Sequence, residues 1–163
     1  MLALRYVYLL ALVVWLGGMV TLGAIVAPAT FQALQAADPI AGRVLAGEAF
    51  GVVIARFHYV AYGAGLLLLF TLAAMAVLGP RPHKFAVRSS LIALMFLVAL
   101  YSGFLVLGEI DTIQREVGTL PSRLAATDPR RIRFDSLHQL STWLMMFNMA
   151  GGVVLLYWEA RER

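Results

Sequence analysis

Histidines and other polar side chains lie within stretches of this sequence that are otherwise apolar. In RFDSLHQLSTWLMMFN, residues 133–148, four side chains repeat every three or four residues and so share one helical face: His138, Ser141, Met145 and Asn148. His58 and Tyr62 form a similar face. Two neutral imidazoles can bind a b-type haem iron or a copper ion, and a methionine thioether is a soft ligand for Cu(I). The candidate ligands are therefore His58, His138 and Met145, with Tyr62, Ser141 and Asn148 lining the same pocket.

The same polar side chains also have a structural interpretation. Histidine, serine and asparagine often form hydrogen bonds between membrane helices, worth about 0.6 kcal/mol each on average. Methionine on a helix face usually packs. Ser141 and His138 are close enough for nucleophile-and-base chemistry, but no acid lies at their depth to orient the imidazole. We therefore name no catalytic residue and expect a protein that is not an enzyme, while ligand binding and helix packing both stay open.

The composition places these residues in a membrane. Of 163 residues, 61% are hydrophobic and 13% are charged, and the mean hydropathy is +0.83. A soluble chain of this size cannot bury so much apolar surface, so the solvent must be lipid. The chain has no cysteine, which excludes disulfides and thiolate metal sites. A scattered net charge of +4 does not indicate nucleic-acid binding, and it suits contact with phospholipid headgroups.

Four stretches free of Asp, Glu, Lys and Arg are long enough to cross a bilayer, which takes roughly 20 helical residues. They are residues 6–37, 57–80, 89–108 and 136–158. We predict an all-α fold, an integral membrane four-helix bundle, with residues 1–163 forming a single four-span domain. The first stretch also resembles a signal peptide after Arg5, but it is much longer than the roughly 7–15 residues of a usual hydrophobic region.

Two of the helices are predicted to start before their membrane spans. Asp38-Pro39 and Asp128-Pro129 are typical helix starts, because aspartate caps free amides and proline fits the first turn. The helices would cover residues 39–78 and 129–159, with loops at 79–84 and 117–127. Both would extend beyond the outer membrane face.

The orientation follows from the cations. With the N-terminus inside, six Lys and Arg residues lie on the inner side and seven on the outer side, so the count alone decides nothing. The inner cations crowd the short loop PRPHKFAVR, whereas carboxylates accompany the outer ones. We predict that both termini are inside. The pocket of His58 and His138 then opens to the outer side of a bacterial cytoplasmic membrane.

Three motifs resemble known families. WLGGMVTLGAIVAPATFQAL, RFHYV and RFDSLHQLSTWLMMFN resemble an uncharacterised bacterial membrane domain grouped with animal transmembrane protein 205. That resemblance implies a four-helix membrane protein without established catalysis and points to metal handling or export. Trp15, Gly17 and Gly18 are distantly similar to the copper-resistance protein D family and to haem-linked protoporphyrinogen oxidases. Those families place a histidine where this chain has Tyr8, so their ligand is missing from the first span.

The function predicted from these observations is that of a small membrane protein whose outer pocket handles a metal ion or haem. The alternatives are an accessory or assembly subunit of a larger membrane complex and a small export factor, with the polar residues serving helix packing only. The expected partners are membrane lipids, other membrane-protein subunits or further copies of the chain, and not nucleic acid.

Overall fold

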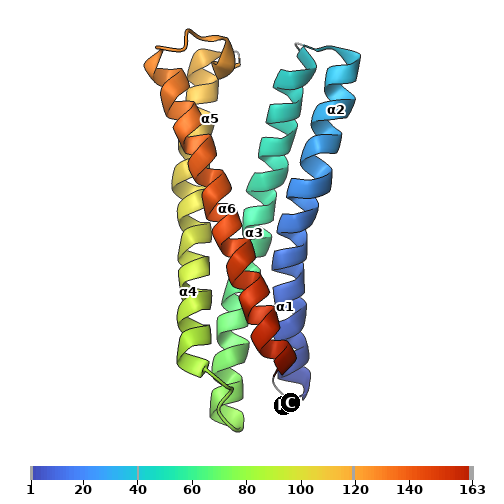
Figure 1. Ribbon diagram of the computed structural model, residues 1–163, viewed down its shortest axis with the longest axis vertical. Helices are drawn as coiled ribbons and strands as arrows, with labels where there is room; N and C mark the ends of the chain where they lie inside the picture. The colour runs from blue at the N-terminus through green and yellow to red at the C-terminus, as the bar shows by residue number, and fades with distance from the viewer. Residues whose placement is uncertain (1, 40, 119, 162–163) are drawn as a thin grey trace.

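The computed structural model describes residues 2–39, 41–118 and 120–161, which form four long helical segments (Figure 1). The first consists of α1 (Leu2–Thr21), the π-helical turn η1 (Leu22–Val26) and α2 (Ala27–Ala37). The second is α3 (Ala41–Leu78). The third consists of α4 (Phe85–Tyr101), the π-helical turn η2 (Ser102–Val106) and α5 (Leu107–Val117). After a short 3₁₀ turn, η3 (Pro121–Arg123), the fourth is α6 (Pro129–Arg161).

All four segments are long and apolar enough to cross a membrane, which confirms the predicted all-α membrane bundle. They contain 36, 38, 33 and 33 residues. At 1.5 Å per residue such helices are about 50–57 Å long, well beyond a hydrocarbon core of about 30 Å. The extension predicted for two helices therefore holds for all four. The third helix continues through charged residues to Val117 because one face of α5 still packs, through Ile113, against Leu137 of α6.

The two predicted capping residues are confirmed by their bonds, and α6 begins at Pro129 as predicted, whereas Pro39 lies in a turn and α3 is described from Ala41. The backbone N–H of Ala41 donates to the Asp38 carboxylate at 2.8 Å, and that of Arg130 donates to the Asp128 carboxylate at 2.9 Å. Each bond satisfies an amide that the first turn of a helix leaves without a partner.

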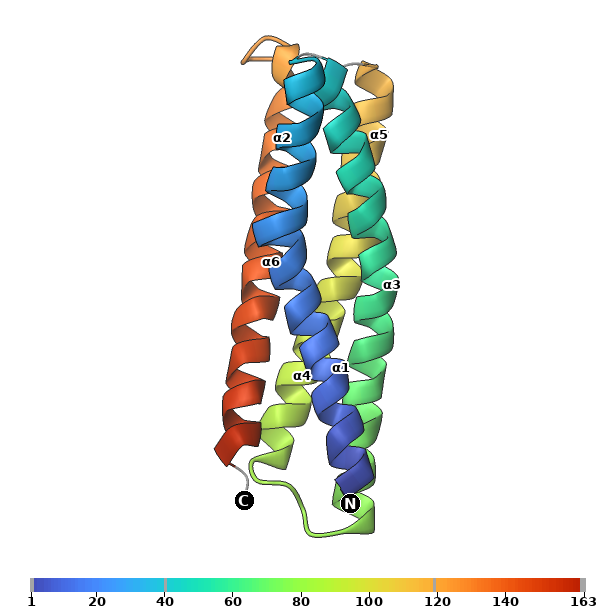
Figure 2. The same ribbon diagram turned by 90° about the vertical axis from the view of Figure 1, so that its right-hand side faces the viewer.

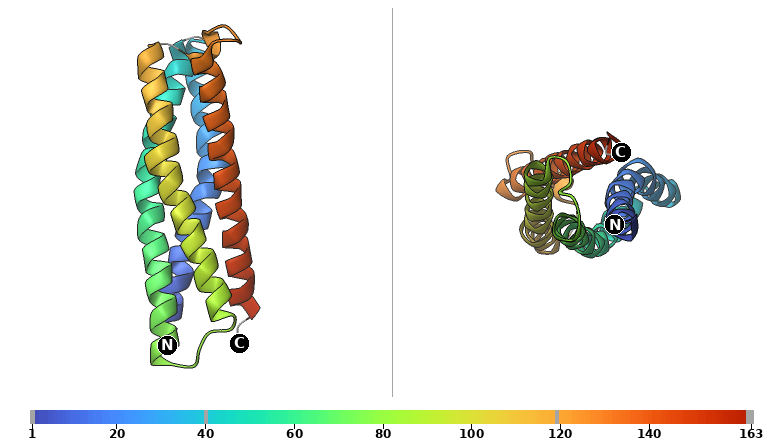
Figure 3. Two further views of the ribbon diagram at one scale, coloured as in Figure 1. Left: turned by 90° about the vertical axis from the view of Figure 1, so that its left-hand side faces the viewer. Right: turned by 90° about the horizontal axis from the view of Figure 1, so that it is seen from below.

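The helices form a ring in which α3 packs against α1, α2 and α4, while α6 packs against α1, α4 and α5 (Figure 3). Helices α3 and α6 therefore face each other across the bundle. The start of α1 and the end of α6 lie at the same end, here called the terminal end (Figure 2). The main core fills this half and joins all four segments through residues such as Trp15, Leu68, Met95 and Leu155.

The opposite end, here called the distal end, has a different arrangement. There α2 pairs with α3 and α5 pairs with α6, and the two helical hairpins diverge (Figure 1). A separate small core of Val106, Ile113 and Leu137 holds the second hairpin together. The bundle is thus one packed unit at the terminal end and two hairpins at the distal end.

Candidate functional site

Charged residues continue the buried stripes of three helices at the terminal end. In α1 the stripe runs through Tyr8, Leu12 and Trp15, and Arg5 lies one turn before it. In α4 Arg88 begins the stripe that continues through Ile92 and Met95. In α6 the stripe of Asn148, Gly152 and Leu155 ends at Glu159. Since each stripe faces the bundle interior, the three charges meet there.

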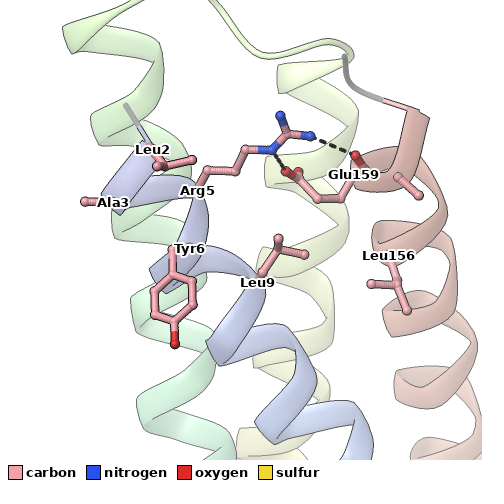
Figure 4. Close-up of a pocket in the computed structure, with 8 residues that line it drawn as sticks. Leu2, Ala3, Arg5, Tyr6, Leu9, Leu156 and Glu159 are labelled. Atoms are coloured by element: carbon pink, nitrogen blue, oxygen red, sulfur yellow. Dashed lines mark hydrogen bonds and ion pairs between the residues drawn. The ribbon is translucent and has the colours of Figure 1, made fainter.

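Arg5, Arg88 and Glu159 form what we call the ion cluster. One carboxylate oxygen of Glu159 accepts from Nε of Arg5 and the other from Nη2 of Arg88. Arg5 Nη2 also donates to the backbone carbonyl of Glu159 at 3.0 Å (Figure 4). The exposed fractions are 38% for Arg5, 3% for Glu159 and 0% for Arg88. A buried guanidinium needs a paired carboxylate, so Glu159 compensates Arg88 while tying α1 and α4 to α6.

Tyr8 belongs to the same environment. Its side chain is fully buried, and the Arg88 guanidinium lies 5.0 Å from the centre of its ring. A cation over an aromatic face is stabilised by the ring quadrupole, more so when both are desolvated. The Tyr8 ring therefore supports the buried cation of the ion cluster.

A cleft of about 740 Å³ lies between α3 and α5 at the distal end. Its α3 wall includes Glu48, Gly51 and Ala55, and its α5 wall includes Asp111 and Arg115. Arg115 pairs with Asp111 at 2.6 Å, whereas Glu48 has no hydrogen bond or ion pair within the described part of the chain. The cleft has an apolar, glycine-rich interior and charges at its sides.

Two of the predicted pocket residues lie behind the wall of this cleft, next to Gly103. His58 and Tyr62 extend the helical face of Gly51 and Ala55, and their ring centres are 5.9 Å apart. Both approach Gly103 of η2, where an added Cβ would lie 2.0 Å from the Tyr62 hydroxyl and 2.6 Å from the His58 ring. Gly103 itself lines the cleft. Only glycine lets the two helices approach this closely, so the two rings support the π-helical turn from behind while Gly103 lines the cleft.

The Tyr62 ring is the centre of an aromatic cluster. It stacks on Phe104 with ring centres 5.5 Å apart and meets three further rings edge to face: His58, Tyr59 and Phe96. The His58 Nδ1 atom lies 2.9 Å from the carbonyl oxygen of Ile54, which fixes the imidazole against its own helix. These contacts leave His58 half-buried beside the cleft.

The other predicted residues lie on α6, across the ring from α3. His138 is exposed and stacks on Phe134, with ring centres 6.1 Å apart. Ser141 donates to the His138 carbonyl at 2.9 Å, and Met145 packs at the edge of the main core. Asn148 is buried, and its side-chain amide oxygen has no hydrogen-bond partner among the described residues.

The structure therefore brings His58 and Tyr62 together. No hydrogen bond or ring contact joins His58 to His138 in the described residues, which also contain no group of three or more His, Asp or Glu side chains arranged for a metal ion. The metal or haem site of His58, His138 and Met145 stays a prediction, and the described contacts add no support for it.

The ion cluster was missed because its charges were taken as the limits of the uncharged spans. A signal for it exists in the sequence. The spacing of His138, Ser141, Met145, Asn148 and Gly152 continues by three and four residues to Leu155 and Glu159. Extending the stripes of the first and third spans in the same way reaches Arg5 and Arg88. Opposite charges on three inward faces at one membrane edge predict a buried pair.

Fold and site together define an integral membrane four-helix protein that is closed by buried charges at one end and split by a cleft at the other. The chain belongs to the family described as a domain of unknown function (DUF4149), whose model matches residues 10–119. The match covers α1 from residue 10 through α5, and so includes Arg88 and both walls of the cleft. No curated protein and no solved structure matches the chain.

Proposed function

We propose that this protein is a small carrier or export factor that binds an amphipathic cation in the cleft between α3 and α5. The observation that carries the proposal is the cleft, which has room for a small organic molecule between two hairpins. The family match names no activity, so the proposal rests on the charge, the lining and the placement of this cleft.

The charges of the cleft favour a cation. Its lining carries two carboxylates, Glu48 and Asp111, and one guanidinium, Arg115. Because Asp111 and Arg115 pair with each other, the carboxylate of Glu48 supplies the remaining negative charge. An organic cation would therefore meet an attractive potential along the α3 wall.

The apolar lining of the cleft suits the same class of ligand. His58 and Tyr62 lie behind Gly103 and hold its backbone in place, beside apolar lining residues such as Val52 and Leu107. This apolar wall would bury the hydrocarbon part of an organic cation. His58 and Tyr62 act here as positioning residues, because they contact Gly103 rather than the cleft itself.

The two ends of the bundle support a carrier rather than a passive receptor. A carrier exposes its site to one side while the other side is closed. Here the cleft opens at the distal end, and the ion cluster joins α1, α4 and α6 at the terminal end. The single four-span domain and a bacterial cytoplasmic membrane with both termini inside are part of this proposal.

Ethidium, a fluorescent amphipathic cation, tests the binding step. Purified protein in detergent should bind it saturably, as measured by fluorescence anisotropy. Gly51→Leu should weaken binding at least tenfold because the added side chain occupies the cleft, where no described atom lies within 4 Å of a Cβ at residue 51. Gly63→Leu is the matched control, because it adds the same side chain at an open position of α3 outside the cleft. Equal binding by the two variants would contradict the proposal.

One observation favours a second function, that of an accessory subunit. Gly47 and Gly51 are four residues apart on the cleft wall, and a Cβ at either would meet no described atom within 4 Å. Such spacing lets two membrane helices approach closely. If a partner helix fills the cleft in native membranes, a Gly51→Cys variant should form a discrete cross-linked product that Gly63→Cys does not, and ethidium should not bind the intact complex.

The metal or haem hypothesis has its own test. A visible spectrum and metal analysis of the purified protein should show a haem band or stoichiometric copper if His58 and His138 are ligands. In that case either single alanine substitution should remove the bound group, and the double substitution should add nothing further.

A further inference from the structure

We propose that a groove between α1 and α6 at the terminal end is a binding site for one anionic phospholipid. The groove holds about 720 Å³ and lies far from the cleft of the proposed carrier function. Leu2, Tyr6 and Leu9 line it from α1, and Leu156 and Glu159 line it from α6 (Figure 4). The site is separate from the cleft, so either can exist without the other.

The groove has a polar end and an apolar end. Arg5 reaches from α1 to Glu159 on α6, and 38% of its side chain is still exposed (Figure 4). Leu9 and Leu156 lie further from the helix ends than this bridge, on the side toward the middle of the membrane. Such a groove matches a lipid, whose headgroup lies near Arg5 and whose acyl chain lies between the two leucines.

Aromatic residues mark the depth of the polar end. Tyr6, Tyr157 and Trp158 flank Arg5 and Glu159 in the sequence. The Lys84 amine lies 5.3 Å from the Trp158 ring centre, and the Arg161 guanidinium lies 5.6 Å from that of Tyr157. Tyrosine and tryptophan concentrate at the level of the headgroups. The polar end of the groove is therefore where a phosphate would lie.

The charge at this end selects an anionic lipid. The Glu159 carboxylate is shared by two guanidinium groups, Arg5 and Arg88, so the ion cluster keeps a net positive charge, and Arg5 is its partly exposed member at the groove. Basic pockets between membrane helices attract anionic headgroups, with about 1 kcal/mol for each guanidinium or ammonium group, or roughly a fivefold change in affinity. A free phosphate ion would leave the apolar length of the groove unused, so a phospholipid is the better match.

Native mass spectrometry of the detergent-purified protein tests this site with phosphatidylglycerol and phosphatidylcholine of identical acyl chains. The wild type should retain one phosphatidylglycerol with at least fivefold preference over phosphatidylcholine. Arg5→Gln should remove that preference. The charge-matched control is Arg161→Gln, which lies outside the groove lining and should keep most of it.

A second pair of variants leaves every charge in place. Leu156→Trp should fill the groove and lower phosphatidylglycerol binding at least fivefold, whereas Leu66→Trp, on the exposed side of α3, should not. This pair decides the matter if Arg5→Gln fails to fold. The proposal would be overturned if the wild type retained both lipids equally, or if inorganic phosphate displaced the lipid. It would also be overturned by equal losses in Arg5→Gln and Arg161→Gln, or by equal losses in the two tryptophan variants. Leu156→Trp should still bind ethidium in the cleft, so a loss of lipid binding in this variant tests the groove without testing the carrier proposal.

Discussion

At the scale of single residues, Glu159 is the described residue whose side chain neutralises the buried charge of Arg88. Its carboxylate is shared between the fully buried Arg88 and the partly exposed Arg5. Removing one member of a buried ion pair leaves an uncompensated charge in a region without water, at a cost of about 3–5 kcal/mol. The apolar core around it cannot supply another acceptor of equal strength for the guanidinium.

Glu159→Gln should therefore lower the free energy of unfolding by about 3–5 kcal/mol. Thermal or denaturant unfolding in detergent measures this, with the exposed Glu116→Gln as a control that should change stability by no more than about 0.5 kcal/mol. The double variant Arg88→Met/Glu159→Met should be more stable than Glu159→Met alone, because both buried charges are then gone. If Glu159→Gln is as stable as the control, the ion cluster does not hold the terminal end together.

Gly103 carries the second residue-scale prediction. A Cβ there would overlap the Tyr62 hydroxyl and the His58 ring, whereas a Cβ at Gly108 in the same segment would meet no described atom within 4 Å. Gly103→Ala should destabilise the protein by about 1–3 kcal/mol through overpacking. Gly108→Ala should be neutral or stabilise by up to about 1 kcal/mol, since alanine is the better helix former. Equal effects in thermal unfolding would mean that α3 and η2 are not in close contact.

At the scale of helices and turns, the sequence predicts starts better than ends. Asp38 and Asp128 were identified as caps because capping depends on local chemistry alone. The third helix continues beyond its uncharged stretch, because a helix that packs on one side needs apolar residues on that face only. The π-helical turns η1 and η2 have no composition signal, and Gly103 in η2 is explained only by the rings of a helix about 40 residues earlier.

The cap at Asp128 makes stability depend on pH. The Arg130 side chain, and then its backbone N–H, hold the pKa of Asp128 below its ordinary value. The stabilisation is therefore complete above the unfolded pKa of about 3.9 and is lost as the pH falls through the lower folded pKa. Asp128→Asn keeps a capping oxygen without a charge. The melting temperature of the wild type should exceed that of Asp128→Asn at pH 6 or so and converge with it in stronger acid; a constant difference would contradict the assignment.

At the scale of the whole molecule, composition and span length were enough to predict the four-helix membrane bundle. The candidate site was only partly predictable. The sequence placed His58 and His138 at a similar depth in the membrane, but depth does not determine which helices are neighbours. In the structure α1 and α4 lie between α3 and α6. The inward face of α6 was predicted correctly for Asn148, whereas Glu159, which ends that face, was taken only as the limit of the uncharged span.

The orientation is a prediction at the same scale. A reporter active only in the cytoplasm should give signal when fused after Arg163 or inserted at His83, because the dense cations of that end should stay inside. Signal from an insertion near Ser122 instead would reverse the orientation and place the cleft on the cytoplasmic side.

The central claim is that the bundle is open to water between its hairpins at one end and closed at the other. Because the chain has no cysteine, single cysteines along α3 test it directly with a water-soluble maleimide in membrane vesicles. Ala55→Cys lines the cleft and should be labelled from the side opposite the termini, and ethidium should protect it. Leu66→Cys, which faces lipid, and Thr71→Cys, which is buried, should stay unlabelled. Labelling of Ala55→Cys no faster than that of Leu66→Cys would contradict the account, because the cleft would then hold no water and admit no ligand from solution.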